Sequence, residues 1–410
     1  MMTKLGLIRS AAAVILAVAV LIATGCSASA PVAPPSPLPP PTVVPSPTTP
    51  PSKAPETPPV PTPQVRTKPA PAEVSLTVNR ATIEFPARII FSLEGTSVKP
   101  VKSLTLEYGT DKRSIIEEVT RVEPAFAPGS AINTRYTWEM KKSGGALPPG
   151  ATVWWRWRIT DDLNREFLSP RNVTTFVDTR FQWQIKQLDL LDIYWQGDNA
   201  SLVNDLTSGL EAMLSRVRLG VNVPSERKIK VFIYPNVEQL KAAMLFPQDW
   251  TGAVAFSQYN IVLVPVNASN LSWAQGALAH EITHLLVGEA VFGPFDDIPV
   301  WLNEGLAEYA EENNLTVGEK NLIDSAMREN RLISVRSLSS NFPTDSQQAY
   351  LSYAESKSIV IYLINRFGWE KMRELLAVFK DGATYDSALK KVFGLDSAAL
   401  DKQWRDSLPA

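Results

Sequence analysis

The pattern that most constrains this chain is His280-Glu281-Ile282-Thr283-His284, which contains the only two histidines among the 410 residues. Residues four apart on a helix lie one above the other on one face, so two neutral imidazoles can bind one divalent ion. Glu281 is placed to take a proton from a metal-bound water. Ser272 and Gly288 are the expected helix limits. The segment predicts a zinc-binding helix; the alternative is a buried helix with two structural histidines.

A third ligand has to complete such a site, because a catalytic zinc takes three protein ligands and leaves one position for water. No histidine remains, which favours a carboxylate. Glu304 is the preferred candidate, and Gly305 beside it allows two helices to approach closely. Asn303 and Glu308 are expected to support the ligands, with Glu308 accepting a hydrogen bond from the outer nitrogen of a histidine. The alternatives for the third ligand are Asp296, Glu289 and Glu311.

Residues 1–26 have the pattern of an export signal. Lys4 and Arg9 precede an apolar run over 11–23, which is short for a membrane span. The run ends in Thr24-Gly25-Cys26, which resembles a bacterial lipobox, although the residue three before the cysteine is Ala23 rather than the commoner Leu. We expect Cys26 to be lipidated and the protein to be anchored outside the cytoplasm, at the bacterial cell membrane or surface. The alternative is an uncleaved N-terminal helix.

Residues 27–72 contain more than half of the chain's 33 prolines. This density forbids helix and favours extended polyproline II, so we expect a disordered tether. At about 3.1 Å per residue it can reach on the order of 140 Å.

Composition excludes some functions and structures. The formal charge of −2 argues against a protein that binds nucleic acid or anionic lipid through bulk charge. With one cysteine the chain can form neither an intrachain disulfide nor a cysteine zinc ribbon. We expect a monomer that meets the membrane only through its N-terminal lipid.

Residues 73–178 alternate apolar and polar positions with a period of two, and turn residues separate the alternating runs. Several short strands at this spacing predict a β-sandwich. The run Pro148–Trp155 resembles the turn and strand of a fibronectin type III or immunoglobulin-like domain. We interpret this region as a spacer or a docking module; a carbohydrate platform built from its tryptophans is the alternative.

Residues 179–410 change to a mixed pattern, which predicts an α+β, zincin-like domain whose C-terminal part is mostly helical. The expected strands are 190–195, 228–234 and 259–264, with 253–256 forming a hairpin or a further strand. The expected helices besides the metal helix are 200–219, one capped by Asn236, 300–309, 316–329, 346–366, 369–380, 385–393 and 398–404.

The histidine motif, 19 intervening residues and Glu304 within Trp301-Leu302-Asn303-Glu304-Gly305 resemble the gluzincin metallopeptidases, the thermolysin-like and aminopeptidase-like zinc enzymes. The bacterial peptidase MA-like domain is the nearest match, and the tail from Tyr385 to Trp404 resembles it too. The resemblance covers residues 180–410. It implies one Zn²⁺ per chain and hydrolysis of peptide bonds in a peptide or protein substrate. It also implies a tyrosine as oxyanion donor, for which Tyr353 is preferred and Tyr350 is the alternative.

Many aminopeptidase-like gluzincins carry a glycine-rich edge strand about two dozen residues before the metal helix, with a glutamate that binds the substrate's free α-amino group. At that distance this chain has Gly252, Ala253, Val254 and Ala255, so the acidic residue is absent. A bare edge strand still pairs with an extended peptide. We therefore expect a surface-tethered peptidase that cleaves internal bonds rather than a dedicated aminopeptidase. The alternatives are a non-catalytic binding or assembly lipoprotein and a zinc hydrolase of a non-peptide substrate.

The lipobox pattern generates a first prediction. Cys26→Ser should leave the protein unprocessed or release it from membranes, because no thiol remains for lipid attachment. Fractionation of the expressing cells and the mass of the mature protein measure this. A variant that matures and fractionates as the wild type does would contradict the prediction.

Overall fold

The computed structural model describes residues 73–143, 147–218, 220–221, 227–247, 252–294, 297–343 and 345–409. The predicted export signal, Cys26 and the Pro-rich tether lie outside these residues. Among the described helices, none combines the length and apolar character that crossing a bilayer requires.

The N-terminal region is rich in sheet, as its alternating pattern predicts. Its described strands are β1 (Val74–Glu84), β2 (Arg88–Thr110), β3 (Thr120–Val122), β4 (Gly129–Glu139), β5 (Ala151–Asp161), β6 (Glu166–Leu168) and β7 (Asn172–Phe176), with the short 3-10 helix η1 (Met140–Ser143) after β4. The first half of β2 pairs with β1 and β4, and its second half pairs with β3 and β5.

The two halves of β2 belong to layers that pack face to face. Phe91 in the first half has its ring centroid 5.5 Å from that of Tyr108 in the second half and 5.7 Å from that of Trp155 on β5. Both layers therefore contribute to one apolar core, as in a sandwich. We call residues 73–178 the sandwich; its closer likeness to fibronectin or immunoglobulin domains stays a prediction.

A second sheet of five strands follows in the order β11-β12-β10-β9-β8. The strands are β8 (Gln184–Gln187), β9 (Leu191–Trp195), β10 (Ile229–Tyr234), β11 (Val254–Phe256) and β12 (Ile261–Pro265), and between β11 and β12 lies η2 (Ser257–Tyr259). The three central strands are parallel and the two outer ones antiparallel. Parallel strands need both faces covered, which explains the continuous apolar runs of β10 and β12.

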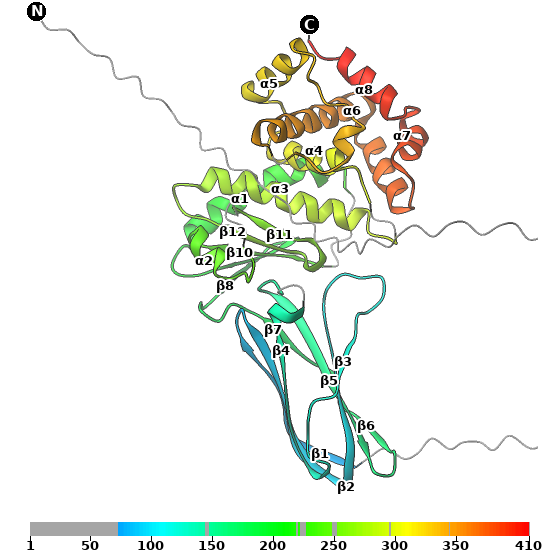
Figure 1. Cartoon of the computed structure of the whole chain (residues 1–410). Helices are drawn as coiled ribbons and strands as arrows, with labels where there is room; N and C mark the ends of the chain where they lie inside the picture. The colour runs from blue at the N-terminus through cyan, green and yellow to red at the C-terminus, as the bar shows by residue number, and fades with distance from the viewer. Residues whose placement is uncertain are drawn as a thin grey trace, which may run out of the picture.

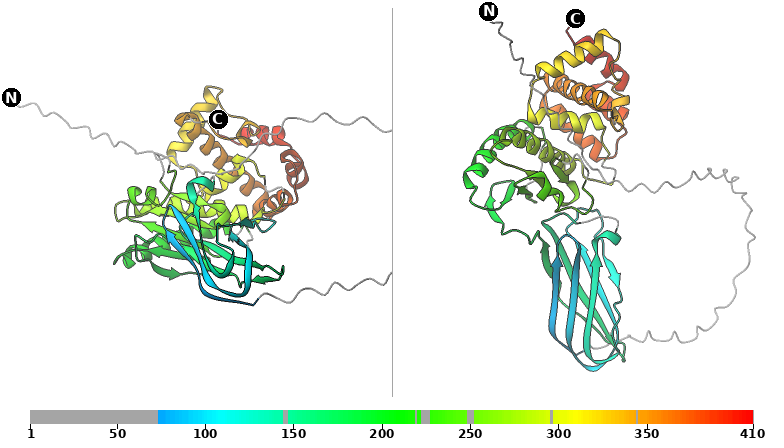
Figure 2. Two further views of the ribbon diagram at one scale, coloured as in Figure 1. Left: turned by 60° about the horizontal axis from the view of Figure 1, so that its bottom comes forward. Right: turned by 60° about the vertical axis from the view of Figure 1, so that its left-hand side comes forward.

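Alternate residues of these central strands face two different layers. Val231, Ile233, Val262 and Val264 pack with α1 (Ala200–Arg218) and α3 (Leu271–Ala290). Phe232, Tyr234, Ile261 and Leu263 join the core of the sandwich and the short helix α2 (Val237–Lys241). In Figure 1 and Figure 2 the sandwich accordingly lies against one side of the five-stranded sheet and the helices lie on the other.

The C-terminal part is helical, as predicted. It comprises α4 (Val300–Glu311), α5 (Val317–Arg328), η3 (Ser337–Ser339), α6 (Ser346–Lys380), α7 (Tyr385–Phe393) and α8 (Ser397–Asp406). The two helices predicted over 346–366 and 369–380 are continuous except for a break at Gly368, whose φ of 79° lies in the left-handed region that favours glycine. This layer covers α3 on the side away from the sheet (Figure 1).

The join between the sandwich and the sheet is tightly packed. A side chain at Gly150, where φ is 95°, would place its Cβ 2.5 Å from the ring of Phe232. Trp183 packs edge-on against Phe232 and Tyr234, and the Tyr234 hydroxyl donates to Asp178. The sandwich therefore packs directly against the five-stranded sheet, which is a closer association than a spacer requires.

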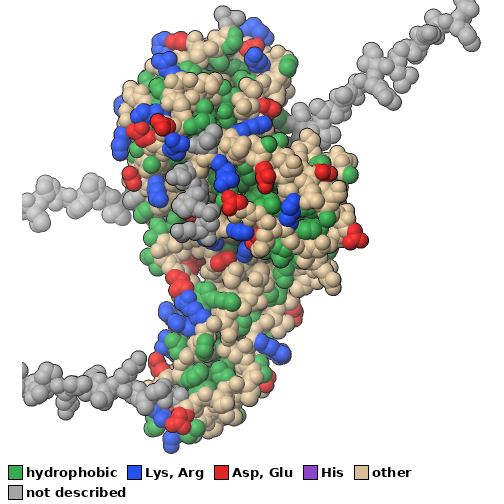
Figure 3. Space-filling model, turned by 180° about the vertical axis from the view of Figure 1, so that it is seen from behind, with side chains coloured by type: hydrophobic (Ala, Val, Ile, Leu, Met, Phe, Trp, Pro, Cys, Tyr) green, Lys and Arg blue, Asp and Glu red, His purple; other side chains and the backbone are tan. Residues whose placement is uncertain are grey.

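Charged side chains are dispersed over the surface. On the face shown in Figure 3, basic and acidic groups alternate rather than gathering in one basic area. Because the formal charge is only −2, long-range electrostatic steering of a charged partner contributes little.

The shared core predicts that the part after residue 179 is not stable alone. A chain starting at Arg180 exposes Phe232, Tyr234, Ile261 and Leu263, each worth about 1.5–3 kcal/mol when fully buried. We expect it to aggregate or to have a clearly lower Tm than a chain starting at Glu73. Thermal unfolding and size-exclusion chromatography of both chains measure this. Equal Tm values with two monodisperse proteins would contradict it.

Candidate metal centre

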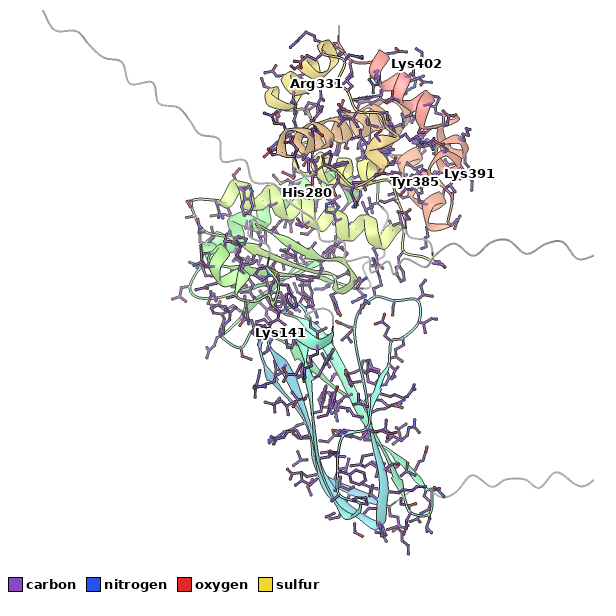
Figure 4. All side chains as sticks on the ribbon, in the orientation of Figure 1. Lys141, His280, Arg331, Tyr385, Lys391 and Lys402 are labelled. Carbon is purple, nitrogen blue, oxygen red and sulfur yellow. The ribbon has the colours of Figure 1, made fainter. Side chains whose placement is uncertain are left out.

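The helix that carries the two histidines is buried on all sides at its centre. Every residue from Ala277 to Val287 is buried, between the five-stranded sheet and the helical layer. The predicted helix limits were wrong: α3 starts at Leu271 and continues through Gly288 to Ala290. Apolar packing on every side keeps the segment helical beyond the glycine. Figure 4 shows His280 on the side of α3 that faces the helical layer.

Three buried side chains converge at this interface. The Nε2 atoms of His280 and His284 each lie 3.5 Å from Oε2 of Glu304, which comes from α4. All three candidate ligand atoms lie within 4.8 Å of one another. Zinc with bonds of about 2.1 Å in tetrahedral geometry keeps its ligand atoms about 3.4 Å apart, so the spacing fits zinc.

The hydrogen bonding of these atoms also fits a cation. Both Nε2 atoms and Oε2 of Glu304 are buried and make no hydrogen bond within the described residues. Burying polar atoms without partners costs free energy, and these three atoms face one another rather than solvent. Burial by itself raises the pKa of Glu304, but His284 and His280 outweigh it and bring that pKa to about 2. A divalent ion is the partner that two imidazoles and a carboxylate share.

The glycine next to Glu304 lets α4 approach a neighbouring helix closely. A Cβ at Gly305 would lie 2.5 Å from the backbone oxygen of Ser356, so only glycine lets α4 pack this closely on α6. The close approach of two helices inferred from the sequence is therefore present, between α4 and α6.

The partner of the outer histidine nitrogen differs from the prediction. Nδ1 of His280 is 2.7 Å from Oε1 of Glu311, whereas Oε1 of Glu308 is 3.8 Å away. Gly276, one turn before His280, leaves room for this carboxylate, since a Cβ there would lie 3.2 Å from Oε2 of Glu311. Glu308 is half-buried beside Glu311, and burial followed by the charge of Glu311 raises its pKa to about 7.

The other carboxylates considered as ligands lie elsewhere. Glu311 approaches the Nδ1 side of His280, away from the Nε2 atoms that meet Glu304. Glu289 pairs with Arg113 of the sandwich at 2.6 Å. Asp296 lies outside the described residues. Among the described contacts, Asn303 makes no hydrogen bond with either histidine, so its supporting role stays a prediction.

Protonation of the histidines opposes metal binding. Burial lowers the pKa of His280, but the neighbouring carboxylates of Glu304, Glu311 and Glu308 raise it well above the ordinary value. A proton has to leave this ring before a metal binds it, so metal affinity falls as pH decreases. With this raised pKa, the loss of metal affinity on acidification begins at a higher pH than it would with a histidine of ordinary pKa.

Glu281 has the environment of a general base. Its side chain is fully buried, and neither carboxylate oxygen has a hydrogen-bond partner among the described residues. Burial raises its pKa, opposed by the adjacent His280 and His284. This carboxylate lies beside the candidate metal ligands and makes no hydrogen bond among the described residues, so it is available to accept a proton.

Both candidate tyrosines come from α6. The pKa of Tyr353 is raised by burial and then by the charges of Glu304, Glu308 and Glu281, so these carboxylates lie within electrostatic range of the phenol. Burial and the charge of Glu308 raise the pKa of Tyr350. Its buried hydroxyl has no hydrogen-bond partner within the described residues. The surroundings of Tyr353 therefore include both the candidate ligand and the candidate base.

The predicted edge strand is shorter than expected. Val254 and Ala255 belong to β11, whereas Gly252 and Ala253 precede it. β11 is the last strand of the five-stranded sheet and pairs only with β12 among the described strands. β11 also packs against α3, the histidine helix.

Comparisons with known proteins give one family-model match and several similar solved structures. Residues 211–410 match the family model described as the Peptidase MA superfamily, and this range contains α3, α4 and α6. An M1 zinc metallopeptidase from Deinococcus radiodurans is similar in structure, with a TM-score of 0.38, 13% identity and coverage of 83% of this chain and 94% of that one. Legionella pneumophila aminopeptidase A in complex with aspartic acid has a TM-score of 0.35 at 12% identity, over 81% of this chain and 50% of that one. No curated protein matches.

The hydrogen bond between His280 and Glu311 generates a prediction about metal affinity. Glu311→Ala should weaken zinc binding about 10- to 100-fold, because the outer nitrogen of a ligand histidine loses its acceptor. The matched control is Glu312→Ala, which removes the exposed neighbouring carboxylate. Competition with a fluorescent zinc chelator at pH 8 and pH 6 measures both variants, with weaker binding expected at pH 6 throughout. Equal affinity of Glu311→Ala and Glu312→Ala would contradict the assignment.

Proposed function

We propose that this protein is a zinc-dependent metallopeptidase that hydrolyses peptide bonds. The convergence of His280, His284 and Glu304, whose buried ligand atoms lack other partners, carries the proposal. The match of residues 211–410 to the Peptidase MA superfamily supports a peptide as the substrate.

Each residue around the cluster has its own role in the proposed reaction. His280, His284 and Glu304 would hold the zinc, which when bound supplies a Lewis acid and lowers the pKa of a water to about 7. Glu281 takes a proton from the attacking water and returns it to the leaving amine. Tyr353 donates a hydrogen bond to the oxygen that becomes negative at the tetrahedral carbon. Tyr350 is the alternative donor.

The substrate would bind as an additional strand. The unpaired side of β11 offers backbone groups beside α3, and an extended peptide pairs with such an edge through its main chain. Gly252, Ala253, Val254 and Ala255 bring no carboxylate to this edge. An α-amino charge brought there would lose water without gaining a partner, so cleavage of internal bonds is favoured.

Location outside the cytoplasm through lipidated Cys26 is part of the same proposal and rests on residues 1–26 alone. The proposal that the sandwich is immunoglobulin-like has support from its strand pairing, with β1, β2 and β4 in one layer facing β3, β2, β5 and β7 in the other.

Metal content and turnover measured together test the peptidase. Zinc-loaded protein of residues 73–410 should cleave members of a mixed peptide library, identified by mass spectrometry. Glu281→Gln should keep its zinc and lose turnover, whereas Glu304→Ala should lose both. Tyr353→Phe should lower kcat about 10²- to 10³-fold while Tyr350→Phe changes it little.

Two outcomes of this test favour the alternatives. Zinc binding without cleavage of any peptide by the wild type favours a binding protein or a hydrolase of another substrate. Full activity of Glu281→Gln would remove the proposed mechanism.

Preference for internal bonds is a separate prediction. One cleavable peptide, prepared with a free and with an acetylated N-terminus, should give kcat/KM values within a few-fold of each other, because no acidic group at β11 recognises an ammonium group. Liquid chromatography of the products measures both rate and cleavage position. Strong preference for the free amine, with residues released singly, would show an aminopeptidase instead.

A further inference from the structure

The segment between β2 and β3, residues 111–119, connects the sandwich to the metal-binding layer; we call it the bridging loop. The backbone N–H of Arg113 donates to the carbonyl of Gln258 at 2.7 Å. Its guanidinium pairs with Glu289 of α3 at 2.6 Å and lies 4.5 Å from the ring centroid of Phe292. The side chain of Arg113 is only 11% exposed, so this attachment is partly buried. Figure 1 shows the loop extending from the sandwich toward α3.

These contacts place the bridging loop at one end of the proposed substrate edge. Gln258 belongs to η2, which directly follows β11. Glu289 is five residues after His284, a rise of about 7.5 Å along the helix. A peptide that pairs with β11 and continues past Phe256 therefore reaches the loop.

The outer part of the loop presents two adjacent apolar side chains. Ile115 is 60% exposed and Ile116 is 80% exposed. The backbone that carries them is anchored, because Ser114 donates to the carbonyl of Ile116 at 2.7 Å and Glu117 pairs with Arg171 at 2.6 Å. An exposed apolar pair on an anchored loop is typical of a contact surface.

The charges of the loop are already compensated. Lys112 pairs with Glu118, Arg113 with Glu289, and Glu117 with Arg171. Anionic lipid is recognised through clustered basic groups, which this arrangement does not offer. The apolar side chains remain as the means of recognition, on the loop whose Arg113 N–H donates to Gln258 just after β11.

We propose that the bridging loop binds apolar side chains of an extended peptide substrate whose backbone pairs with β11. The sandwich is then part of the substrate-binding surface, and Ile115 and Ile116 select apolar residues beyond those next to the cleaved bond. This inference rests on the proposed peptidase function and deepens it by naming a substrate class: segments long enough to span β11 and the loop, with apolar residues at one end.

The test uses an Ile115→Ser/Ile116→Ser double variant of residues 73–410. Val98→Ser is the matched control, since Val98 is 66% exposed on β2 of the same sandwich, outside the loop. Three peptides are the probes. The first is a long peptide from the library with leucine at the positions that would extend beyond β11, and the second has serine at the same positions. The third is a short peptide that contains only the residues around the cleaved bond.

For the leucine peptide we expect KM to rise about tenfold in the double variant with kcat unchanged. The serine and short peptides should show no change, and Val98→Ser should behave as the wild type with all three. Binding of the leucine peptide to the Glu281→Gln protein, followed by fluorescence anisotropy with and without the double substitution, gives the same comparison without turnover.

The outcomes separate this inference from the proposed function. If the wild type cleaves but the double variant has unchanged KM and binding, the loop assignment is overturned and the peptidase stands. If the wild type cleaves nothing, the peptidase fails, and the anisotropy comparison still decides whether the loop binds the peptide. A double variant that changes sedimentation but not peptide binding would show a contact between copies of the chain, which also overturns the inference.

Discussion

The structure depends on three buried ligand atoms that face one another across two helices. Oε2 of Glu304 lies 3.5 Å from the Nε2 atoms of His280 and His284, and none of the three has a hydrogen-bond partner within the described residues. Burying such groups costs free energy unless a partner offsets their desolvation, and two imidazoles and a carboxylate fit a divalent ion. Gly305 and Gly276 allow the close approaches that the arrangement requires.

The three layers follow from this requirement. α3 is buried from Ala277 to Val287, which needs a sheet on one side and a helical layer on the other. The sheet then has a second apolar face, formed by alternate residues of β10 and β12, and the sandwich covers it. Both faces of these strands are apolar, so both have to be covered. The N-terminal region covers one of them and is therefore part of the same folded unit.

The contacts of the sandwich change its interpretation. A spacer would touch the following layers at few points, yet Arg113 makes a partly buried ion pair with α3 and a backbone hydrogen bond to the segment after β11. The same loop presents Ile115 and Ile116 to solvent. Support of the sheet and contact with substrate are two roles that one small domain can combine.

The sequence alone determined the features that depend on local spacing: the histidine helix, Glu304, the strand and helix order, and the break near Gly368. Tertiary structure decided the rest. Which carboxylate meets Nδ1 of His280 depends on how α4 crosses α3, so Glu311 rather than Glu308 takes that position. Packing extended α3 past Gly288. The shared core and the Arg113 bridge join residues far apart in sequence, and no local pattern encodes such contacts.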